Sequence, residues 1–125
     1  MAYAKELVGV GVPPVTAVGM GGQYSAVTAA GSAITDATQV KASMAIVSGA
    51  DGTKGVYLQG DVGDEVWLFN DSASTLKVYG DTSSVAIAVP GTGLGTAGAA
   101  FSHLTYKTVI YKKVSSTQWL PQVTA

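Results

Sequence analysis

Three glycines, Gly93, Gly95 and Gly98, have the G-x-G-x-x-G spacing of a dinucleotide-binding turn. Such a turn needs a helix directly after the glycines, because the N-terminus of that helix binds the pyrophosphate. It also needs an acidic residue about twenty positions later, which binds the ribose. Here an alternating pattern typical of a strand follows Gly98, and no Asp or Glu occurs after Asp81. The sequence therefore predicts a glycine-rich loop between two strands, over residues 90–100, and not a phosphate site.

The chain has one histidine, His103, and three acids that are close in sequence, Asp61, Asp64 and Glu65. A catalytic or zinc-binding histidine needs partner residues, and the sequence places none beside His103. We interpret it as a histidine at the end of a loop, or as a pH-sensitive contact at an interface. The acids could bind calcium, but their spacing is not that of a calcium loop, and a soluble turn explains them equally well. We assign no catalytic residue, no cofactor and no metal site.

Composition excludes several classes of partner. Of the 125 residues, 47% are hydrophobic and 12% are charged, about half the usual ~25%. The net charge is −1, and all seven basic residues are lysines. Nucleic-acid binding depends on a basic surface, and electrostatic binding to a membrane also needs one. We therefore expect neither partner. The low charge indicates either an unusually large apolar core or surface that other protein chains cover.

The elements that would position these residues are β-strands, because helix signals are nearly missing and β-branched residues and turns recur. Strands are expected over residues 39–47, 54–59, 65–70, 75–79, 84–89, 104–114 and 118–124. Between the first two, Asp51-Gly52 is typical of a tight hairpin turn with positive φ. No solenoid repeat is visible in the sequence. Short strands at roughly ten-residue spacing predict an all-β fold, a single antiparallel β-sandwich or barrel that is jelly-roll-like.

Residues 1–36 differ from the rest, since they are rich in Gly, Ala, Val and Thr. No formal charge occurs between Glu6 and Asp36. We interpret this region as an extended N-terminal arm followed by an extended lead-in over residues 23–30, and assign the β-domain to residues 37–125. An arm of this composition cannot bury itself, so we expect it to lie on another surface, with a flexible leader as the alternative.

The stretch "EVWLFN" (residues 65–70) has large apolar residues on both faces of the predicted strand. Val66 and Leu68 share one face, and Trp67 and Phe69 share the other. Such a strand is covered on both sides, either by loops of its own chain or by a partner subunit. We predict that Trp67 and Phe69 lie at a subunit interface.

Four stretches carry a resemblance to a known group of proteins. They are "GVPPVTAVGMGGQYSAVTAAGS", "VSGADGTKGVYL", "GDEVWLFNDSASTLKVYG" and "VIYKKVSSTQWLP". From about Gly11 to Pro121 the chain resembles small β-rich structural proteins of tailed bacteriophage virions, of the head decoration (cement) or head-fibre type. The chain departs from these proteins over residues 90–100 and 106–114, which leaves the partner surface open.

The resemblance implies a non-enzymatic capsid decoration protein on the surface of the virion. Such a protein binds the major capsid protein on the outer surface of the head and stabilises the shell, here as a homotrimer held by Trp67 and Phe69. The residues expected to bind the capsid are apolar positions of the arm: Leu7, Val8, Val10, Val12, Pro13, Pro14, Val15, Val18 and Met20.

Two other functions remain open at this point. One is a head- or tail-fibre component with a role in host adhesion. The other is a carbohydrate-binding module, in which strand aromatics would stack on sugars. The candidate aromatic residues are Tyr57, Trp67, Tyr79, Tyr106, Tyr111 and Trp119.

Overall fold

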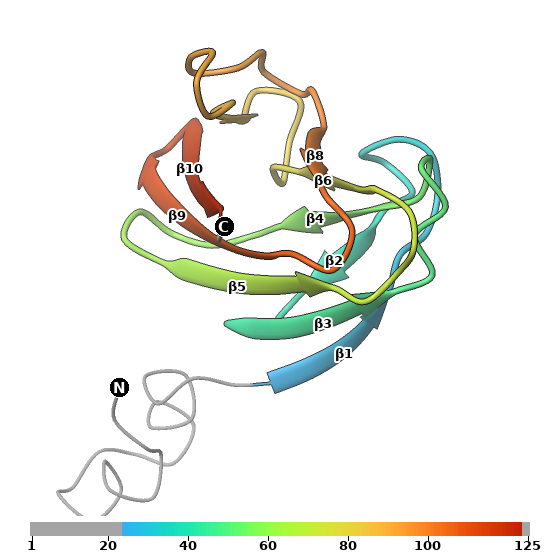
Figure 1. Cartoon of the computed structure of the whole chain (residues 1–125). Coiled ribbons are helices and arrows are strands. Elements are labelled where there is room, and N and C mark those ends of the chain that lie inside the picture. Colours follow the sequence, from blue (N-terminus) through green and yellow to red (C-terminus); the bar gives the residue numbers. More distant parts are fainter. Residues whose placement is uncertain (1–23, 124–125) are drawn as a thin grey trace, which may run out of the picture.

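The computed structural model describes residues 24–123, which form an all-β fold of two sheets (Figure 1). The strands are β1 Tyr24–Thr28, β2 Thr38–Val40, β3 Met44–Ser48, β4 Gly55–Leu58, β5 Glu65–Asn70, β6 Leu76–Tyr79, β7 Ala86–Ile87, β8 Phe101–His103, β9 Thr108–Ser115 and β10 Gln118–Val123. The larger sheet has the order β1-β3-β5-β9-β10-β7, and the smaller has the order β2-β4-β6-β8. Neither sheet closes into a barrel. The capsid-binding residues predicted between Leu7 and Met20 lie outside the described residues.

The first six strands alternate between the two sheets. In the larger sheet β1, β3 and β5 pair in parallel, and in the smaller sheet β2, β4 and β6 do the same. The backbone of Tyr24 pairs with Met44, and Met44 pairs with Trp67 on the following pass. The chain thus winds through both sheets in successive coils, as in a β-solenoid.

This path corrects the prediction of antiparallel, jelly-roll-like sheets. The turn at Asp51-Gly52 shows the reason. Gly52 has the expected positive φ of 94°, but β3 and β4 on either side of the turn belong to different sheets. The predicted hairpin is therefore a crossing between layers. A turn motif in the sequence predicts the local backbone conformation, but it does not predict which strands will pair.

The C-terminal strands pair mostly antiparallel and complete the sheets. β8 pairs with β6, β9 pairs with β5, and β10 pairs with β9, all antiparallel, whereas the two-residue β7 lies parallel to β10. The antiparallel prediction is confirmed only for this part of the chain. The result is two mixed sheets.

Strand positions agree with the sequence in some places and differ in others. The strand predicted over residues 65–70 is β5, and the lead-in predicted over residues 23–30 contains β1. Because β1 pairs with β3, the folded part includes residues before position 37. The strand predicted over residues 39–47 is interrupted, because residues 41–43 carry the chain from β2 to β3 in the other sheet. The strand predicted over residues 104–114 begins only at Thr108, because residues 104–107 form a turn after β8, a strand that was not predicted.

One apolar core lies between the sheets. It combines Val47 and Leu68 from the larger sheet with Leu58 and Val78 from the smaller sheet, and all four are fully buried. Trp119 on β10 is also fully buried in this cluster. The alternation of apolar residues along each strand therefore directs one face of each sheet inward.

The glycine-rich segment over residues 90–100 is a loop between β7 and β8, as predicted. A strand and not a helix follows Gly98. Gly95 has a φ of +76°, and a Cβ atom there would lie 2.3 Å from the carbonyl oxygen of Ile87. Glycine is needed at this position for backbone conformation and for close approach.

Candidate functional site

The outer face of the larger sheet carries exposed apolar side chains. On β5, Val66 and Leu68 are buried in the core, whereas Trp67 remains 39% exposed and Phe69 is half-buried. The alternation predicted for this strand is therefore confirmed. Trp67 and Phe69 lie on the outer face of the larger sheet, which the described residues leave partly exposed.

Neighbouring strands extend this apolar face. The register places Met44 beside Trp67 and Ile46 beside Phe69 on β3. On the other side, Ile110 of β9 lies beside Trp67. Ile46 is 42% exposed. We call Met44, Ile46, Trp67, Phe69 and Ile110 the Trp67 face.

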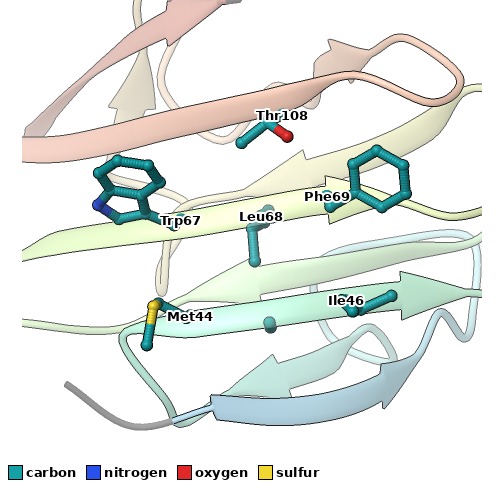
Figure 2. Close-up of a pocket in the computed structure, with 7 residues that line it drawn as sticks. Met44, Ile46, Trp67, Leu68, Phe69 and Thr108 are labelled. Atoms are coloured by element: carbon teal, nitrogen blue, oxygen red, sulfur yellow. The ribbon is translucent and has the colours of Figure 1, made fainter.

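A shallow groove of about 260 Å³ runs across the Trp67 face (Figure 2). Met44 and Trp67 lie at one end of the groove, and Ile46 and Phe69 lie at the other. Thr108 is the polar residue of the lining, and the buried Ala45 and Leu68 complete it. The volume is below the ~300–1,000 Å³ of typical small-molecule sites. The groove therefore suits contact with protein side chains better than binding of a substrate.

An ion pair borders this surface. The Lys112 Nζ atom lies 3.7 Å from the Glu65 Oε1 atom, and both side chains are about half exposed. Glu65 pairs with Lys112 two positions along β5 from Trp67. An exposed ion pair of this kind contributes about 0–1 kcal/mol to stability. The ion pair matters because of where it lies. Protein interfaces usually have an apolar centre surrounded by a polar rim, and this pair lies at the edge of the apolar Trp67 face.

His103 is the last residue of β8, directly before the turn over residues 104–107, and it is fully buried within its own chain. The alternative prediction of a contact at an interface is therefore wrong. The Nε2 atom of His103 lies 2.6 Å from the Lys107 carbonyl oxygen, and its Nδ1 atom lies 2.9 Å from the Tyr111 hydroxyl. Because a carbonyl only accepts hydrogen bonds, Nε2 carries the proton and Nδ1 accepts from Tyr111. Burial lowers the pKa of His103, although the Lys107 hydrogen bond opposes this. Burial also raises the pKa of Tyr111 well above 10.0. The pair is a neutral core contact.

Asn70 extends the same network to the turn between β8 and β9. Its buried Nδ2 donates to the carbonyl oxygens of His103 at 3.2 Å and Ser74 at 2.9 Å. The backbone carbonyl oxygen of Asn70 accepts a hydrogen bond from the backbone N–H of Tyr106 at 2.9 Å. Tyr106 has a φ of 54°, which is uncommon for a residue other than glycine. The turn is thus held in one conformation while Leu104 and Tyr106 stay exposed. The sequence signal for this network is a polar residue that ends an apolar strand.

Two of the three acids considered for calcium, Asp64 and Glu65, use their side chains in other contacts. Asp64 accepts a hydrogen bond from the backbone N–H of Asp61 at 2.8 Å, and Glu65 pairs with Lys112. Within residues 24–123 no group of three or more His, Cys, Asp or Glu side chains is arranged to hold a metal ion. Nor does this part of the chain contain a helix long and apolar enough to cross a membrane.

The aromatic residues considered for sugar stacking do not share one surface. Tyr111 and Trp119 are fully buried in the core. Trp67 lies on the outer face of the larger sheet, whereas Tyr57 and Tyr79 pair in the smaller sheet. A platform formed by all these residues is therefore not present, and the Trp67 face is the strongest candidate site.

Comparison with protein-family models, with curated proteins and with solved structures finds no match to this chain.

Proposed function

We propose that this chain is a non-enzymatic decoration (cement) protein, which binds the outer surface of a phage head and stabilises the shell as a homotrimer. The observation that carries the proposal is the Trp67 face, an exposed apolar surface bordered by the Glu65–Lys112 ion pair. The sequence resemblance to decoration proteins supports the same conclusion. In this proposal Trp67 and Phe69 hold the subunits together on the shell.

The size of the face indicates that a second contact is needed. A stable interface buries about 800 Å² on each partner, more than a few half-exposed side chains supply. Burying a large apolar side chain completely contributes about 1.5–3 kcal/mol, so five partly exposed residues give moderate affinity. The apolar segment of residues 7–20 would supply the second contact, with the major capsid protein as its partner. Three such segments on one trimer would bind the shell with avidity.

Binding to purified phage heads that lack their decoration protein tests the proposal. The chain is mixed with heads, the heads are sedimented, and the retained protein is measured over a range of concentrations. We expect saturable retention with a fixed number of chains per head. A chain without residues 1–22 and the double variant Trp67→Ala/Phe69→Ala should each be retained less.

Leu120→Ala is the matched control, because Leu120 is exposed on the same sheet but lies beside Lys112, at the rim of the Trp67 face. It should be retained like the unaltered chain. Heads that lack their decoration protein but can rebind it serve as the positive control. Absence of saturable retention of this chain on those heads would reject the proposal.

The turn over residues 104–107 favours a second candidate, a fibre component that contacts the host. Leu104 and Tyr106 are 55% and 58% exposed on a turn that Asn70 and His103 hold in place. A rigid exposed tyrosine is a common anchor in protein recognition. Binding of the labelled protein to host cells, and its loss in Tyr106→Ala, would favour this function over decoration.

A further inference from the structure

We propose that residues 7–20 bind the Trp67 face of their own chain in the free protein, and thereby prevent premature self-association. The docking is a property of the free chain and needs no capsid. Only its release at the shell rests on the proposed function.

The end of β1 places this segment next to the groove. β1 begins at Tyr24, whose backbone pairs with Met44, and Met44 in turn pairs with Trp67. Adjacent strands lie about 4.8 Å apart, so the backbones of Tyr24 and Trp67 are separated by roughly 10 Å. About ten residues link Pro14 to Tyr24, and such a length spans up to ~33 Å when extended. The segment therefore reaches the groove even after a reversal of direction, which Gly21 and Gly22 permit.

The chemistry of the segment matches the groove. No formal charge occurs between Glu6 and Asp36, so the segment loses no charge solvation when it is buried. The groove is apolar apart from Thr108. Pro13-Pro14 favours the extended polyproline conformation, and grooves lined by aromatic side chains are the usual binding sites for that conformation. Trp67 and Phe69 supply such a lining (Figure 2).

Tethering favours the same chain over a second copy. A short flexible connection gives an effective concentration in the millimolar range, well above the micromolar concentration of chains in solution. Intramolecular docking therefore prevails until a competing surface binds the segment. At the shell, transfer of the segment to the capsid would uncover the Trp67 face for contacts between subunits.

The two tryptophans allow a direct test. Trp119 is fully buried, whereas the groove residue Trp67 is 39% exposed. Acrylamide quenching of fluorescence therefore reports on Trp67, and the variant Trp67→Phe isolates the signal of Trp119. In the monomeric full chain we expect Trp67 to be protected. In the variant Pro13→Gly/Pro14→Gly, and in a chain without residues 1–22, acrylamide quenching of Trp67 should be severalfold stronger than in the full chain.

Light scattering on the same samples completes the experiment. We expect the full chain to stay monomeric at micromolar concentration and both altered chains to self-associate as concentration rises. Pro90→Gly removes a proline from the loop between β7 and β8 and should behave like the unaltered chain. Equal quenching in all chains, or protection of Trp67 that disappears on dilution of an oligomer, would overturn the proposal.

Failure of this inference is separable from failure of the proposed function. If heads retain the chain but Trp67 is quenched in the free monomer, only the intramolecular docking is wrong. If Trp67 is protected but heads retain nothing, the docking stands and the decoration function is wrong.

Discussion

At the scale of single residues, His103, Tyr111 and Asn70 introduce polar groups into the buried interior. Both ring nitrogens of His103 have a partner, and Asn70 donates to the carbonyl oxygen of the same residue. Leaving one buried polar group without a partner costs about 1–3 kcal/mol. The network therefore favours one arrangement of the adjoining turn, and it requires a neutral histidine.

This requirement predicts a dependence of stability on pH. Burial lowers the pKa of His103 below its ordinary value of 6.5, so below pH 6.5 the unfolded chain binds more protons than the folded chain. The contribution of His103 is fully present above pH 6.5 and is lost as pH falls toward the lowered pKa. We expect the free energy of unfolding, measured with urea, to decrease from pH 7 to pH 5.

The variant His103→Gln provides the comparison, because its side chain does not titrate. Its stability should be lower at pH 7 but should lack the decrease between pH 7 and pH 5. Asp51 does not interfere, since hydrogen bonds from Thr53 and Lys54 lower its pKa from 3.8 to about 2. Any stabilisation from Asp51 is present above pH 3.8 and is lost between pH 3.8 and 2. An identical slope in both chains would show that His103 is not responsible.

The sequence was informative about some of these residues and not about others. Alternation along one strand is a local property, so it placed Trp67 and Phe69 opposite Val66 and Leu68 without any knowledge of the neighbours. The burial of His103 depends on β8, which follows a glycine-rich loop and has only three residues. Nothing in so short a stretch distinguishes a strand from a loop end.

At the scale of elements, the main difference from expectation is the direction of pairing. The strands of the coiled part were mostly found, because β-branched and apolar residues alternate in them. Whether a turn reverses the chain within a sheet or carries it to the opposite sheet is set by packing of both layers. The crossing over residues 41–43, Lys-Ala-Ser, contains neither Gly nor Pro to mark a turn, so the sequence predicted a single strand over residues 39–47.

The loop between β7 and β8 allows a matched test of glycine roles. Gly91 and Gly95 have φ values of +78° and +76°, but only Gly95 would place a Cβ atom against another group, the Ile87 carbonyl. The change Gly91→Ala should lower stability by about 1–2 kcal/mol through backbone strain alone. The change Gly95→Ala should lower stability further, because the backbone of β7 must move.

Thermal unfolding of the two variants under identical conditions measures this difference. A midpoint for Gly95→Ala that lies clearly below the midpoint for Gly91→Ala is expected. Equal midpoints would mean that the loop can shift away from Ile87 without any loss of stability.

At the scale of the whole molecule, the low charge decides how the chain associates. With a net charge of −1 and few charged residues, long-range electrostatic attraction to a partner is weak. We therefore predict that retention on phage heads is insensitive to NaCl between 50 and 500 mM. Sulfate, which strengthens apolar association, should increase retention. The sedimentation assay measures both effects, and a steep decrease with NaCl would instead indicate an interface dominated by ion pairs.

The pairing of β9 with β5 has a consequence for synthesis of the chain. β5 ends at Asn70, but its antiparallel partner begins at Thr108. At about 5–20 residues per second, translation leaves that edge of β5 without its partner for several seconds. The segment is six residues long and rich in aromatic and aliphatic side chains, a composition that favours aggregation through exposed strand edges. The nascent chain is therefore more vulnerable than the finished protein, and synthesis that stops before Thr108 should yield insoluble material.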